Sequence, residues 1–307
     1  MKNEPSLYDL LCLLLFVRNL FSKHLLSIIL LFLILNISTF FSYNPIRSLE
    51  YNLVTLLLFS SFLFFKDINI NCWRYFLMGN LLSIIITYYR GFLQFNSTYW
   101  YYTRFMGGYK DPNVFAPALL LVLLIAFQLN FFKKIFTILT IPGIILAQSR
   151  AVFAALALII TNKLRRSILF FISAVSLAIY FLPYVLAKMS LRGYDSNRFS
   201  GQVDALKLTS LFGNGSTSSD YLVGHPPHSL YVRMISDIGL LPSLLFFVVF
   251  VSIVTLKKVE IRRITFLVPI LLISLVIDTV HWRMFYVFLG FVFSHVYSIS
   301  RTVSKAA

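Results

Sequence analysis

Long apolar runs follow one another along almost the whole chain, and short polar stretches separate them. A helix needs a run of about 20 apolar residues to cross the hydrocarbon core of a bilayer. Only 12% of the residues are charged, whereas a soluble domain has about a quarter. The pattern therefore predicts an all-α, polytopic membrane protein and disfavours a soluble domain.

The runs predict a single membrane domain, 1–307, with about 10–11 transmembrane helices. The expected spans are 25–42, 49–65, 75–89, 113–131, 135–148, 150–161, 167–187, 229–256, 263–280 and 284–300. Residues 7–17 are apolar but short, which favours an interfacial helix or an incomplete span. We expect a turn at Gln148, Ser149 and Arg150, because one long helix there would put neighbouring basic clusters on opposite sides of the membrane.

The basic residues of the short loops predict the orientation. If the spans alternate across the membrane, the basic residues of these short loops all lie on one side. The positive-inside rule identifies that side as the cytoplasm. The outer side then holds the loop 90–112 and the long loop 188–228. The net charge of +16 therefore reflects topology. No nucleic-acid partner is expected, because no basic region lies outside the membrane to bind one.

Basic residues also accumulate on the outer side, where the same rule predicts few. Arginine forks match the oxygens of phosphate groups, so the set predicts a phosphate-bearing ligand. Anchoring to lipid headgroups is the alternative explanation for each arginine alone, together with local pairing to one of four aspartates, Asp195, Asp204, Asp237 or Asp278. The outer basic residues are Arg90, Arg104, Lys110, Arg150, Lys188, Arg192, Arg198, Arg233 and Arg283.

Residues 224–239 combine rare polar groups at the boundary of an apolar run. Two prolines precede His228, and Ser229 could cap a helix that starts near residue 230. The imidazole of His228 could take a proton near neutral pH. Alternatively, it could be an interfacial histidine that is hydrogen-bonded to the loop. Arg233 and Asp237 are four residues apart, so a structural ion pair is expected between them.

Metal ligands are sparse in the sequence. Two prolines separate His225 from His228, and no third ligand is evident, so no metal site is expected. Cys12 and Cys72 are the two cysteines, and we do not expect them to pair.

Three further stretches have ordinary explanations beside functional ones. Asp111 and Pro112 form a typical helix start, which could also orient Arg104 and Lys110 toward an outer cavity. The aromatic stretch 88–105 is typical of an interfacial belt, or could form a wall on which sugars stack. Residues 213–215, Gly-Asn-Gly, are expected to form a flexible turn and not a phosphate loop.

Four motifs occur in a fixed order. The first is Arg104–Asn113, which ends in Asp-Pro-Asn, and the second is Gln148–Ala151 between short spans. The third is Arg198 followed by Leu211–Gly215, and the fourth is Pro227–Tyr231 leading to Asp237-Ile-Gly. Together they resemble the O-antigen polymerase/ligase superfamily of bacterial envelope glycosyltransferases.

The resemblance implies inverting glycosyl transfer without metal or cofactor at the periplasmic face of the bacterial inner membrane. The implied donor is an oligosaccharide on undecaprenyl pyrophosphate. Arg104, Arg150 and Arg198 would bind or neutralise the pyrophosphate, and His228 would orient or deprotonate the acceptor hydroxyl. Further expected substrate contacts are Lys110, Asp111, Asn113, Arg192, Arg233 and Tyr231.

The favoured activity is a polymerase that joins repeat units, with a chain-length regulator as a further expected partner. A ligase that transfers the finished glycan to lipid A-core uses the same donor chemistry and is the nearest alternative. A flippase for lipid-linked glycans would need polar residues distributed through its spans. A non-catalytic scaffold would tolerate the loss of His228 and the arginines.

Overall fold

The computed structural model describes residues 7–95, 97–109, 111–163, 196–224, 227–255, 267, 269–271, 273–275, 278–279 and 282–294. Helices make up most of this part of the chain, and one two-stranded hairpin accompanies them. The prediction of a helical protein is therefore confirmed.

Two of the helices are long and apolar enough to cross a membrane, α3 (Pro45–Asp67) and α4 (Ile70–Leu93). Asn44 and Asn69 cap their first turns, accepting from the backbone N–H groups of Arg47 and Cys72. α1 (Leu7–Leu20) and α2 (Leu25–Ile37) form a pair bent by 115°, with η1 (Ser38–Phe41) extending the second helix. Among the described residues, two helices or at most three spans meet the length and apolarity criteria, fewer than the sequence predicts.

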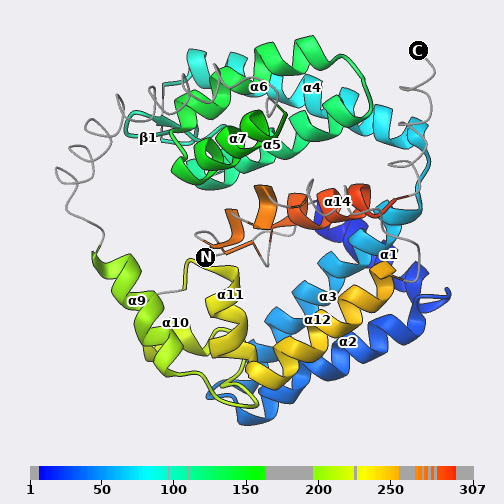
Figure 1. Ribbon diagram of the computed structural model, residues 1–307, viewed down its shortest axis with the longest axis vertical. Coiled ribbons are helices and arrows are strands. Elements are labelled where there is room, and N and C mark those ends of the chain that lie inside the picture. The colour runs from blue at the N-terminus through cyan, green and yellow to red at the C-terminus, as the bar shows by residue number, and fades with distance from the viewer. Residues whose placement is uncertain are drawn as a thin grey trace.

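In Figure 1, α1, α2, α3 and α12 (Leu240–Thr255) lie together in the lower part of the molecule, and α14 (Arg283–Val292) lies above them. Small polar residues allow close packing around α3, where Ser60 and Ser61 are fully buried. Asn19 of α1 donates to the Ser60 carbonyl at 3.0 Å. α14 approaches α3 at Gly290, where a Cβ would lie 2.5 Å from that of Phe65.

The upper part contains α4, α5 (Pro112–Gln128), α6 (Lys133–Ala147) and α7 (Arg150–Lys163), with β1 (Trp100–Tyr101) and β2 (Arg104–Phe105) beside them (Figure 1). α5 is the centre of this group, because residues 115–126 are all buried. Gln148 adopts a left-handed φ of 51° between α6 and α7. The predicted turn at 148–150 is therefore confirmed.

The predicted span 229–256 is not one helix. α11 (Leu230–Arg233) runs into a π-helical turn, η2 (Met234–Ile238), and α12 begins only after Gly239. Gly239 has a φ of 98°, which a helix cannot accommodate. Ser229 occupies the N-cap position of α11 without a side-chain cap hydrogen bond. Residues 229–239 thus belong with the polar loop and not with the apolar helix.

Other predicted segments are covered in part. The span 167–187 lies outside the described residues, as do half of the residues of 263–280 and the end of 284–300. Within the long loop the structure contains α9 (Ser196–Lys207) and α10 (Ser218–Leu222).

Replacing Gly290 with alanine should destabilise the fold, because the new methyl group overlaps Phe65 and the backbone of α3. Overpacking of this kind costs about 1–3 kcal/mol. Gly79→Ala is the matched control, since a Cβ there meets nothing within 4 Å and alanine favours a helix by about 1 kcal/mol. Thermal unfolding in detergent, followed by circular dichroism, should show a lower midpoint for Gly290→Ala only. Equal midpoints would contradict the packing.

Candidate functional site

The first two motifs meet at the break between α6 and α7. Asp111 accepts from the Asn113 backbone N–H at 2.7 Å and so caps α5, as predicted. Arg104 donates from Nη2 to Asn113 Oδ1 at 2.9 Å and from Nε to the Ala147 carbonyl at 3.0 Å. A longer contact of 3.4 Å joins Nη2 to the Gln148 carbonyl. Arg104 thereby satisfies carbonyls at the end of α6 that have no helical partner.

Arg150 has a different environment from Arg104. It is exposed and stands first in α7, where the unpaired N–H groups of a helix favour an anion. Next to it, the Ser149 hydroxyl is buried and has no hydrogen-bond partner in the described structure. Of the two arginines, Arg150 is thus the one that can meet a ligand without giving up contacts with backbone carbonyls.

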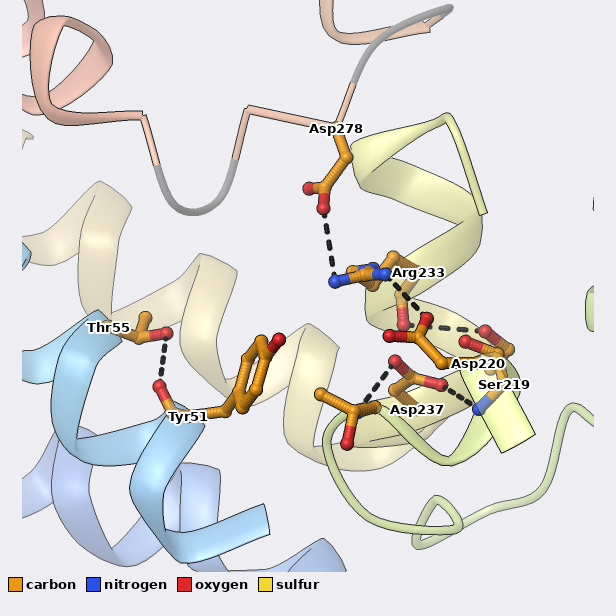
Figure 2. Close-up of polar contacts among 9 residues, drawn as sticks. Tyr51, Thr55, Ser219, Asp220, Arg233, Asp237 and Asp278 are labelled. Carbon is orange, nitrogen blue, oxygen red and sulfur yellow. Dashed lines mark hydrogen bonds and ion pairs between the residues drawn. The ribbon is translucent and has the colours of Figure 1, made fainter. Parts of the chain in front are cut away.

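An ion cluster surrounds Arg233, which is buried, while its two carboxylate partners are half-buried. Its Nη2 lies 2.8 Å from Asp220 Oδ1 and its Nη1 lies 3.2 Å from Asp278 Oδ2 (Figure 2). The side chain of Arg233 is only 9% exposed. Burial raises the pKa of the Asp220 carboxyl, while the charges of Arg233 and Arg47 lower it. Two carboxylates therefore engage the guanidinium, which disfavours the expected contact between Arg233 and phosphate.

Asp237 does not form the predicted ion pair with Arg233. Its carboxylate accepts from the backbone N–H groups of Thr217 at 3.0 Å and Ser219 at 2.9 Å. The π-helical turn widens the backbone between the two residues, so the four-residue spacing of an α-helix does not apply. Burial raises the pKa of Asp237 to about 6, against these N–H groups and the charge of Arg233. Asp237 is therefore a carboxyl that can exchange a proton near neutral pH.

A small pocket opens beside this cluster, between α3 and the turn η2. Tyr51 and Thr55 come from α3, and Figure 2 shows the Tyr51 ring directed toward the Arg233 side. The Nε of Arg233 is buried and has no partner in the described structure. The remaining lining residues are Ser216, Thr217, Met234, Asp237 and Ile238.

The third and fourth motifs also meet. The backbone N–H groups of Asn214 and Gly215 donate to the Asp237 carbonyl at 3.0 and 2.9 Å. The Asn214 side chain donates to the Ser236 carbonyl at 3.1 Å, and Gly213 packs directly against Gly239. Residues 213–215 are thus hydrogen-bonded to the chain reversal that precedes α12.

The remaining predicted site residues lie in different parts of the structure, and some side chains are outside the described residues. His228 is half-buried directly before α11, and Tyr231 donates to the Leu271 carbonyl at 3.3 Å. Arg198 lies in α9, but its side chain is outside the description, as are Lys110 and Arg192. The structure does not gather Arg150 and His228 into one cluster, because α7 lies in the upper group of helices and α11 in the lower (Figure 1).

Sequence reasoning missed Tyr51 and Asp220 as members of a polar site, and it gave Asp278 only as one of four aspartates that could pair with an outer arginine. Asp220 and Asp278 are far from Arg233 along the chain, so no local spacing relates them. The available signal was their rarity, since the chain has only 11 acidic residues. A carboxylate in so apolar a chain needs a cationic or hydrogen-bonding partner.

Arg233→Leu should destabilise the loop and its junction with α12, because Asp220 and Asp278 lose their counter-ion. Removing one partner of a buried ion pair costs about 3–5 kcal/mol. Lys207→Leu is the control, because its pair with Asp204 is exposed and such pairs contribute about 0–1 kcal/mol.

Thermal unfolding and limited proteolysis should separate the Arg233 and Lys207 variants. Adding Asp220→Asn and Asp278→Asn to Arg233→Leu should recover part of the loss, since the uncompensated charges are gone. Identical stability of the Arg233 and Lys207 variants would contradict a structural role for the cluster.

Comparison of the chain with family models, with curated proteins and with solved structures gives no match.

Proposed function

We propose that the protein is a polytopic glycosyltransferase of the bacterial inner membrane that joins undecaprenyl-pyrophosphate-linked repeat units at the periplasmic face. The observation that carries this proposal is the spatial pairing of the four motifs. Arg104 hydrogen-bonds to Asn113 and to the break before Arg150, while the 214–215 turn binds the Asp237 backbone. Residues on which the resemblance depends thus meet although they are distant in sequence.

The proposed donor site centres on Arg150. Departure of a lipid pyrophosphate develops negative charge, which an arginine and a helix N-terminus stabilise without a metal ion. Arg150 is exposed at the start of α7 and meets both conditions. Arg104 is a positioning residue in this proposal, because it fixes the end of α6 through its contacts with backbone carbonyls. Arg198, Arg192 and Lys110 are further proposed phosphate ligands.

His228 is the proposed base. It takes the proton of an acceptor hydroxyl as that oxygen attacks the anomeric carbon of the donor. The bond between this carbon and the phosphate oxygen breaks, and undecaprenyl pyrophosphate leaves from the opposite face, which inverts the configuration. Buried Pro227 and Ser229 flank His228 and restrict its orientation. Because Arg150 and His228 must act on one carbon, the upper and lower helices have to close around the substrate.

The apolar helices and the basic loops support the proposed membrane setting. α3 and α4 have the length and apolarity of spans, and basic short loops orient the chain by the positive-inside rule. A lipid-linked donor can then enter sideways between helices.

His228→Ala should abolish elongation of the surface glycan. The measurement is the glycan ladder on a gel from a deletion strain complemented with each variant at matched membrane levels. Core that carries a single repeat unit is the expected result for a polymerase. His24→Ala is the matched control and should keep the full ladder. His24 pairs with Asp67, the last residue of α3, and has no role in the proposed reaction.

Two other ladders would contradict the proposal. Bare core, with glycan accumulating on undecaprenyl pyrophosphate, would indicate a ligase. An unchanged ladder for His228→Ala would remove this residue from the mechanism and favour a transporter or a scaffold.

A further inference from the structure

An exposed group of aromatic side chains, here called the aromatic rim, surrounds the end of α4 and the tip of the hairpin. Tyr101 and Tyr102 at the tip are 53% and 85% exposed. The rim comprises Tyr89, Phe92, Phe95, Tyr101 and Tyr102, all of them exposed. Soluble proteins rarely expose such a contiguous aromatic surface without a partner.

The rim is fixed rigidly to α4. Trp100 donates from Nε1 to the Gly91 carbonyl at 2.8 Å and stacks on Phe95 with ring centroids 4.5 Å apart. Phe105, fully buried, stacks on Phe92 at 5.9 Å. These stacking contacts hold the hairpin against the last turns of α4.

The surface of α4 leads from an apolar helix face directly into the rim. Only 17% of the most apolar window of α4 is buried inside the protein. Leu82, Ile85 and Ile86 are exposed along it, and Arg90 is exposed in its last turn, next to Tyr89. An apolar face that ends in tyrosines and an arginine has the chemistry of a helix leaving the hydrocarbon core at the headgroups.

We propose that the aromatic rim binds the phospholipid headgroup region and thereby sets the depth of the break between α6 and α7. The mechanical link is Arg104, which lies in the hairpin and donates to the carbonyls of Ala147 and Gln148. The proposal rests on the proposed passage of α4 through the membrane, but not on glycosyl transfer. Its consequence is that Arg150 lies at the level of lipid phosphates, in reach of a lipid-linked pyrophosphate.

Spin labels on single cysteines test this depth directly. All variants carry Cys72→Ser, since Cys72 is exposed, and keep Cys12, which is buried. Thr103→Cys places a label at the hairpin tip, Arg150→Cys places one at the break, and Leu82→Cys places one midway along α4. The full-length protein is reconstituted in vesicles of phosphatidylethanolamine and phosphatidylglycerol. Collision of each label with oxygen and with a water-soluble nickel chelate is then measured by power saturation.

We expect the labels at 103 and 150 to collide with both reagents and to report the same headgroup depth. The label at 82 should collide with oxygen and be shielded from the nickel chelate. Adding Tyr101→Ser and Tyr102→Ser should increase nickel collision at 150, because the break moves toward water. Tyr75→Ser removes an exposed tyrosine at the other end of α4 and should leave position 150 unchanged.

The contradicting results are distinct. If the label at 82 lies in hydrocarbon while that at 103 is as accessible to nickel as a label in free solution, the anchor is wrong and the membrane span stands. A label at 103 shielded from both reagents would indicate a protein partner on the rim and overturn the lipid assignment. If the labels at 82 and 103 both lie in water, α4 does not cross the membrane, and both the anchor and the proposed membrane enzyme fail.

Discussion

The charge of Arg233, buried against two aspartates, is the interaction on which the arrangement of the polar loop depends. It joins α10 through Asp220, α11 through its own backbone and a distant segment through Asp278. An uncompensated charge at this depth would cost several kcal/mol, so the three segments must stay together. Asp237 holds the chain reversal before α12 against the same loop, because its carboxylate accepts from the backbone N–H groups of Thr217 and Ser219.

The loop is also bound to α3. The Ser216 N–H donates to Ser48 at 2.9 Å, and the Ser216 hydroxyl contacts Asn52 at 2.5 Å. Arg47 lies over the Tyr221 ring and donates to its hydroxyl. The polar side chains in the N-terminal part of α3 therefore bind the loop and give its backbone hydrogen-bond partners that it would otherwise lack.

Two kinds of signal in the sequence were enough for two features. Asp111 before a proline predicted the cap of α5, which depends on a few consecutive residues. The break between α6 and α7 was predicted from the basic clusters that flank residues 135–161, because the positive-inside rule places both clusters on one side of the membrane. The break at Gly239 could not be predicted in this way, because it depends on contact with Gly213 and on the partners of Asp237 in the loop. The same limitation applies to Arg104 and Arg233, since an arginine that binds carbonyls or aspartates resembles one that binds phosphate.

The most direct test of the proposed function is the reaction of the purified protein with an undecaprenyl-pyrophosphate-linked repeat unit in the presence of a chelator of divalent ions. We expect glycans of increasing length and release of undecaprenyl pyrophosphate, with both lost in Arg150→Ala. A repeat unit that stays unextended with correctly folded wild-type protein, both with and without divalent ions, would contradict the proposal that the protein is a glycan polymerase.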